Sequence, residues 1–145
     1  MTPKLLLRIA AGLLLFFAFG HTIGHVTRHQ AEGAQQTVNQ TMRDVQFDFF
    51  GNTTSYDGMY NGLSLNLIFT LIVFATILWF VANVVNEKPI LATQLVWPLM
   101  LCVLGFAVTS FLYFFLVPAI TCFLAALSMG GALAVLSRRR RMLPH

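Results

Sequence analysis

The chain has 145 residues, of which 57% are hydrophobic and only 10% are charged. Soluble globular domains carry roughly 25% charged residues, so this composition excludes an ordinary soluble protein, and lipid must be the main solvent. The net charge of +4 does not indicate nucleic acid as a partner. Four of the basic residues form one block, Arg138 to Arg141, directly after a hydrophobic segment, which is typical of the cytoplasmic flank of a membrane span.

Four apolar segments are long enough to cross a bilayer, whose hydrocarbon core requires about 20 helical residues. They cover approximately residues 5–26, 63–85, 89–113 and 118–136. The last two have no charged linker between them, so a tight hairpin between Val108 and Pro118 must separate them, because one continuous helix would overshoot the membrane. We therefore predict an all-α membrane protein, with four transmembrane helices in one bundle and a single membrane domain.

A signal peptide is the alternative interpretation of the first segment. Lys4 and Arg8 make a basic start, residues 9–19 form an apolar core, and Ala18-Phe19-Gly20 resembles a cleavage site. Cleavage there would leave His21 as the new amino terminus. Because the chain retains this segment, we interpret it as a membrane anchor.

The basic residues predict the orientation of the spans. With the amino terminus inside, seven basic residues lie on the inner side and only two, Arg28 and Arg43, on the outer side. This is a positive-inside bias, which predicts a multi-pass membrane protein with both termini in the cytoplasm. Residues 27–61 then form an outer cap, and residues 137–145 form a basic cytoplasmic tail.

The outer loop contains a predicted amphipathic helix. Its apolar positions recur at helical spacing: Val38, Met42, Val45 and Phe49. Polar residues occupy the other side of the helical wheel, so we expect the helix to lie on the membrane surface or to cap the bundle. It should end near Gly51, after which Ser55 or Asp57 is positioned to cap the second span.

The histidines near the outer end of the first span indicate a metal site. His21 and His25 are one helical turn apart on nearly the same face, as two ligands of a transition metal would be, while His29 is displaced around the helix. The third ligand or general base would come from the aspartates of the outer loop: Asp44, Asp48 and Asp57. Such a set leaves coordination positions open for water or substrate.

Other roles for these histidines remain open. Thr22 stands where an HExxH motif would have its glutamate, and the histidines are equally consistent with structural polar contacts at the membrane boundary. A five-coordinate haem, or one with Met59 as a further ligand, is a weaker alternative, because the other three spans contain no histidine. Gly20 and Gly24 are best explained as a small-residue seam against another helix.

A second polar group surrounds the start of the second span. We predict a polar pocket lined by Arg28, Tyr56, Tyr60, Asn61 and Ser64. Tyrosines at this depth also occur simply as part of the aromatic belt at the membrane–water interface.

Three stretches carry a resemblance to a known family. They are Leu-Leu-Leu-Arg-Ile-Ala-Ala-Gly at residues 5–12, Gly-His-Thr-Ile-Gly-His at residues 20–25, and the aromatic-rich turn at Gly51 with Tyr56-Asp57-Gly58. Over about the first 65 residues the chain resembles a family of small bacterial four-span membrane proteins with no assigned activity. The resemblance implies four spans and a bacterial inner-membrane location, and it implies no mechanism.

Three functions follow as hypotheses. The first is a metal-dependent membrane enzyme or cofactor protein that acts on a hydrophobic substrate such as a lipid or quinone. The second is a non-enzymatic protein that binds a lipid or hydrophobic small molecule at the same polar site. The third is an accessory subunit of a larger membrane protein. Membrane lipids are expected partners in each case.

Overall fold

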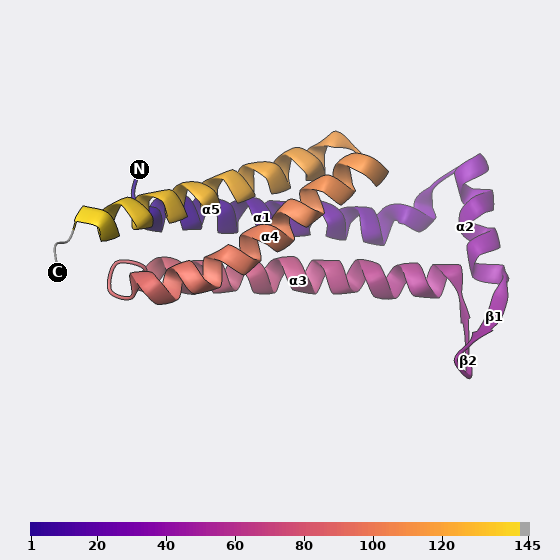
Figure 1. Cartoon of the computed structure of the whole chain (residues 1–145). Helices are drawn as coiled ribbons and strands as arrows, with labels where there is room; N and C mark the ends of the chain where they lie inside the picture. The colour runs from indigo at the N-terminus through magenta and orange to yellow at the C-terminus, as the bar shows by residue number, and fades with distance from the viewer. Residues whose placement is uncertain (143–145) are drawn as a thin grey trace. The chain divides into compact units, whose positions relative to one another are not determined.

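A computed structural model describes residues 1–142 of the chain. Four long helices, α1 (Pro3–Thr27), α3 (Tyr56–Val84), α4 (Pro89–Tyr113) and α5 (Leu116–Met142), are each long and apolar enough to cross a membrane (Figure 1). The predicted helical membrane protein with four spans is therefore confirmed.

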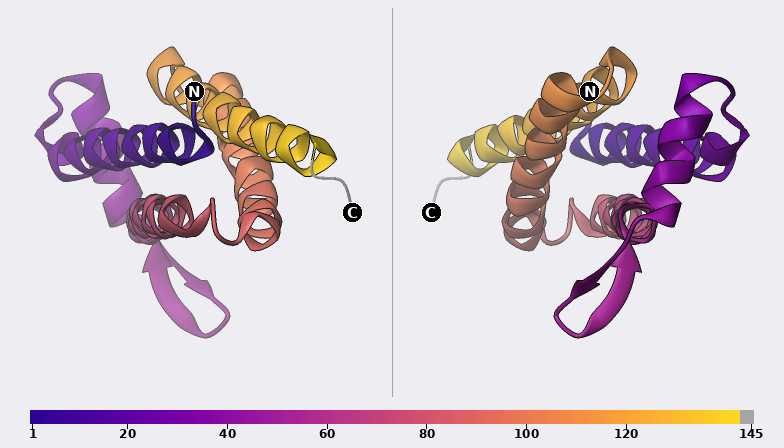
Figure 2. Two further views of the ribbon diagram at one scale, coloured as in Figure 1. Left: turned by 90° about the vertical axis from the view of Figure 1, so that its left-hand side faces the viewer. Right: turned by 90° about the vertical axis from the view of Figure 1, so that its right-hand side faces the viewer.

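The long loop between α1 and α3 has structure of its own. It contains a short 3-10 helix, η1 (Arg28–Gln30), the helix α2 (Ala34–Asp44), and a hairpin of strands β1 (Gln46–Phe49) and β2 (Asn52–Ser55). In Figure 2, where α3 is seen along its axis, the hairpin projects away from the start of α3 toward the bottom of the view. The short helix predicted for this loop is thus present.

The helix boundaries follow local signals as well as hydropathy. α4 begins at Pro89, where proline's missing N–H costs nothing, and it ends at Tyr113, as predicted. α3 begins at Tyr56 rather than at residue 63, because Ser55 caps it: the backbone N–H of Gly58 donates to Ser55 Oγ at 3.1 Å. The apolar run alone could not reveal this polar first turn of the helix.

The carboxyl-terminal boundary differs from the prediction. We expected the last span to end near residue 136 and a basic tail to follow, but α5 continues through the arginine block to Met142. Arginine is a good helix former, and positive charge is favourable near the carboxyl end of a helix. The rest of the predicted tail, residues 143–145, lies outside the described residues.

The loop helix is shorter than predicted. α2 ends at Asp44, and the chain then becomes extended, so Phe49 belongs to β1 and not to the helix. The turn consists of Phe50 (φ +52°) and Gly51 (φ +81°), and positive φ at both central residues is the geometry that matches the twist of a two-residue hairpin. The apolar residues at 45, 47 and 49 also alternate with period two, so the helical spacing was only one of two patterns present.

The structure divides into two compact units. One comprises Ala18–Thr70: the carboxyl-terminal part of α1, the loop elements and the first part of α3. The other comprises Met1–Phe17 and the chain from Leu71 onward, so it contains parts of all four long helices.

In the second unit the helices contact one another in a ring. α4 and α5 form a closely packed helical hairpin (Figures 1 and 2). Phe74 of α3 stacks on Phe106 of α4 with their ring centroids 6.4 Å apart, and Gly131 of α5 faces Leu6 of α1. The largest fully buried side chains of this core include Leu7, Leu14, Leu71, Leu78, Val96, Val103, Cys122 and Met129.

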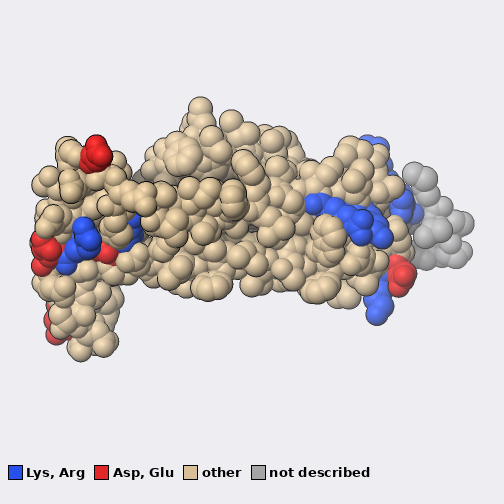
Figure 3. Space-filling model, turned by 180° about the vertical axis from the view of Figure 1, so that it is seen from behind, with Lys and Arg blue, Asp and Glu red and all other residues tan. Residues whose placement is uncertain are grey.

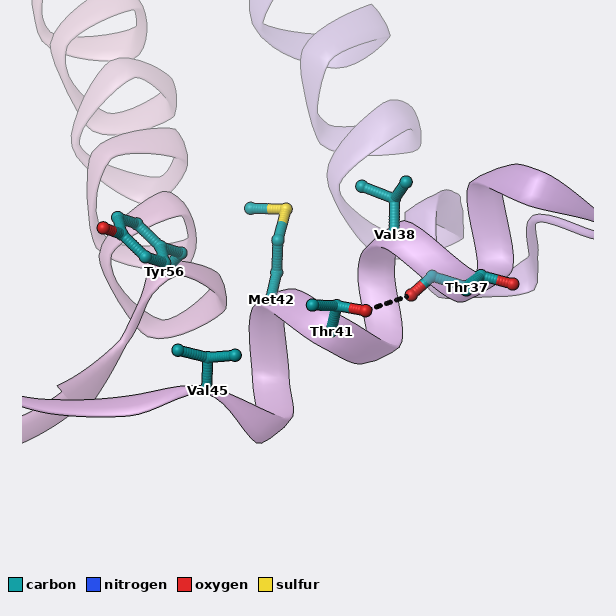
Figure 4. A pocket seen from close by; sticks show the side chains of 6 residues that line it. All are labelled: Thr37, Val38, Thr41, Met42, Val45 and Tyr56. Atoms are coloured by element: carbon teal, nitrogen blue, oxygen red, sulfur yellow. Dashed lines mark hydrogen bonds between the residues drawn. The ribbon is translucent and has the colours of Figure 1, made fainter.

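In the first unit α2 keeps its apolar face uncovered. Asn39 Nδ2 donates to the carbonyl oxygen of Arg28 at 2.8 Å and ties α2 to η1. On the apolar side, Val38, Met42 and Val45 form, with Tyr56 of α3, an open groove of about 270 Å³ that also includes Thr37 and Thr41 (Figure 4). The dashed bond in that view, from Thr41 Oγ1 to the Thr37 carbonyl at 2.9 Å, lies within α2. None of the α2 residues is buried.

Candidate functional site

The two histidines of α1 converge on one serine of α3. His21 Nε2 and His25 Nδ1 each lie 2.9 Å from Ser64 Oγ. The histidines share a face of α1 because they are four residues apart, and Ser64 is 5% exposed while both imidazoles are half-buried. The sequence analysis placed the two histidines in a metal site and Ser64 in a separate polar pocket, so their contact was not predicted. We call these three residues the His–Ser–His cluster.

The serine hydroxyl limits the protonation pattern of the cluster. It carries one proton, so it donates to at most one imidazole, and a bond to the other ring requires that ring to donate its N–H. At least one of the two ring nitrogens is therefore a donor. His25 Nε2 is not enclosed and has no hydrogen-bond partner among residues 1–142. It can therefore exchange a hydrogen bond with a molecule that approaches α1.

Arg28 and Asp57 form a buried ion pair nearer to the end of the helices. Arg28 Nη2 donates to Asp57 Oδ1 at 2.6 Å, and the two side chains are only 11% and 12% exposed. The guanidinium also lies 4.6 Å from the centroid of the Tyr60 ring, and Asn61 Nδ2 donates to Asp57 Oδ2 at 3.3 Å. Asp57 sits in the first turn of α3, where the helix dipole favours negative charge.

His29 joins this second cluster through hydrogen bonds from Arg28. Arg28 Nε and Nη2 both lie 3.1 Å from His29 Nε2. A guanidinium can only donate, so His29 Nε2 is the acceptor of these bonds. The same nitrogen is 3.7 Å from Asp57 Oδ1. We call Arg28, His29, Asp57, Tyr60 and Asn61 the Arg–Asp cluster.

The aspartates proposed to complete a metal site do not join the histidines. Asp57 is engaged by Arg28 and Asn61, and Asp44 and Asp48 are exposed, at the end of α2 and in β1. Among residues 1–142 no group of three or more His, Cys, Asp or Glu side chains is arranged to hold a metal ion. The geometry of the His–Ser–His cluster thus supplies two imidazoles and a hydroxyl but no carboxylate.

Two further predicted features lie elsewhere. Tyr56 lines the groove beside α2, and its ring contacts that of Phe47 in a tilted arrangement with the centroids 4.8 Å apart. The predicted seam at Gly20 and Gly24 is wrong for contacts within this unit, because a Cβ at either glycine would meet no atom within 4 Å. Small residues permit close packing, but no helix of this unit uses it at these positions.

The position of Ser64 is the part of the site that sequence reasoning did not anticipate. It was assigned to a polar lining, yet it links both imidazoles. The available signal was a serine near the outer end of an otherwise apolar span, which is costly unless its hydroxyl is bonded. Its partners depend on the rotation of α3 against α1, and no local pattern encodes that rotation.

Comparisons of this chain with protein-family models, curated proteins and solved structures find no match. The functional conclusion therefore depends on the contacts of these side chains.

Proposed function

We propose that this membrane protein binds a lipid-soluble molecule through a hydrogen-bonding polar group at the His–Ser–His cluster, without catalysing a reaction. The observation that supports it most is the shared bond of His21 Nε2 and His25 Nδ1 to Ser64 Oγ. This bond orients His25 and leaves its Nε2 available to a carbonyl or hydroxyl group. Without a carboxylate in the cluster, a binding role explains the geometry better than a metal-dependent reaction does.

The apolar surface around the cluster suits a ligand that arrives from lipid. Ile23 and Val26 of α1 are 47% and 62% exposed, so the flank of α1 beside His25 would face acyl chains. The groove at α2 begins at Tyr56, about 12 Å along α3 from Ser64 at 1.5 Å per residue. A molecule with a small polar head and an apolar body matches this arrangement of surfaces.

Ser64→Ala tests the binding proposal. We expect wild-type protein in mild detergent to retain a non-protein molecule in native mass spectrometry, and Ser64→Ala to lose about tenfold in affinity for it. A hydrogen-bond network that orients a ligand contributes about 1–1.5 kcal/mol, which corresponds to roughly tenfold. Folding should persist, because side-chain hydrogen bonds between membrane helices average about 0.6 kcal/mol.

The matched control is Thr70→Val on the same helix, because Thr70 Oγ1 donates only to its own helix, at the Asn66 carbonyl. It should retain the molecule as the wild type does. A wild-type spectrum without any bound molecule would contradict the proposal. Elemental analysis of the same sample supplies the other decisive outcome. A stoichiometric transition metal that His21→Ala removes would favour the metal-dependent function instead.

We also infer that the protein lies in a bacterial inner membrane with both termini in the cytoplasm. The excess of basic residues at the ends of the chain and beside Lys88 supports this orientation. A green fluorescent protein fused to the carboxyl terminus should fluoresce, and alkaline phosphatase inserted between Phe50 and Gly51 should be active outside. The reverse pattern of the two reporters would contradict the orientation.

A further inference from the structure

The basic end of the second unit contains an arginine that has no ion pair with any carboxylate of the described residues. Arg8 of α1 lies within a candidate membrane span, where an unpaired charge is costly. Its Nη2 donates to Asn83 Oδ1 at 3.2 Å, and its guanidinium carbon lies 4.8 Å from the centroid of the Trp79 ring. Both partners, from α3, are neutral, so they orient the guanidinium without cancelling its charge.

The remaining donors of Arg8 also lack acceptors. Nε is enclosed and has no hydrogen-bond partner among the described side chains, while Nη1 has no partner there and is not enclosed. The ion pair with Arg28 and the contact with His29 are both made by Asp57, which belongs to the other unit. The carboxyl end of α3 offers only about half a negative charge. Among the described residues, therefore, no anion balances the charge of Arg8.

Further cations surround the same end of the unit. Lys4 precedes Arg8 by one turn of α1 and so shares its face. Arg139 of α5 donates from Nη1 to Asn86 Oδ1 at 3.1 Å, again a neutral acceptor. Glu87 is the single acidic residue of this unit. Figure 3 shows the blue basic side chains gathered at this end, beside one acidic side chain.

We propose that Arg8, held by Trp79 and Asn83, binds the phosphate of an anionic membrane phospholipid, with Lys4 and Arg139 adding to the attraction. Guanidinium groups suit phosphate because they present several N–H donors in one plane. Arg8 lies roughly 7–8 Å along α1 from its first residue, Pro3, and tryptophan is typical of the headgroup level of membranes. This depth favours a lipid phosphate over a free phosphate ion. The site is distinct from the His–Ser–His cluster.

Lipid retention by the full chain tests this site. Native mass spectrometry of detergent-purified protein with added phosphatidylglycerol should show bound lipid, and Arg8→Gln should weaken that binding about tenfold. Arg43→Gln is the matched control, since Arg43 is an exposed arginine of α2 in the other unit, and it should leave the binding unchanged. Equal retention in the two variants would overturn the proposal.

A measurement on the wild type remains decisive if Arg8→Gln does not fold. A ligand that binds only the folded state raises the unfolding temperature. Phosphatidylglycerol should therefore raise it more than the same concentration of phosphatidylethanolamine, and excess inorganic phosphate should not displace the bound lipid. Equal effects of the two lipids, or displacement by inorganic phosphate, would overturn the assignment to an anionic phospholipid.

Discussion

Replacement of Asp57 by asparagine should destabilise the unit of residues 18–70 by about 3–5 kcal/mol, because it leaves the Arg28 charge buried without a counterion. The pair is short, 2.6 Å, and both side chains are nearly enclosed. Asparagine also removes the negative charge that the first turn of α3 favours. The free energy of unfolding, measured by denaturant titration in detergent and followed by circular dichroism, gives the effect directly.

Two controls distinguish the ion pair from a general effect of losing an acid. Asp48→Asn should change the free energy of unfolding by less than about 0.5 kcal/mol, because Asp48 is exposed in β1. Arg28→Gln combined with Asp57→Asn should recover much of the stability lost in Asp57→Asn, since no buried charge then remains. If the double variant lost as much free energy of unfolding as the two single variants together, the two residues would not be coupled.

Leu78→Ala should cost about 2 kcal/mol or more in the unit that contains α4 and α5. Leu78 is fully buried, and alanine would leave a cavity where its side chain packs. We expect a destabilisation near the low end of the range for replacing a buried leucine with alanine. Lipid tails are as apolar as leucine, so the substitution mainly removes packing contacts. Thermal unfolding in lipid nanodiscs provides the measurement.

Phe80→Ala is the matched control for this packing effect. Phe80 lies two residues further along α3 and is 65% exposed, so in a membrane it should contact lipid rather than other helices. Its replacement should leave the stability within about 0.5 kcal/mol of the wild type. A loss as large as that of Leu78→Ala would mean that the buried and lipid-facing sides of α3 are assigned incorrectly.

Most of the fold could be predicted from hydropathy. Long apolar runs reveal membrane helices because each spans the hydrocarbon core with all its backbone hydrogen bonds internal, and the bounds of α4 agree with the prediction. The errors occurred where a polar or ambiguous stretch decided the boundary. α3 starts earlier because Ser55 caps it, and Phe49 forms a strand because a turn at Phe50 and Gly51 pairs two short segments.

The candidate site could be predicted in composition but not in its pairings. The spacing of His21 and His25 places them on one face of a helix whatever surrounds it, so their proximity follows from the sequence alone. The association of Asp57 with Arg28, and of both histidines with Ser64, depends on how α1 and α3 face each other in the unit. Local periodicity carries no information about that rotation, and only tertiary packing decides it.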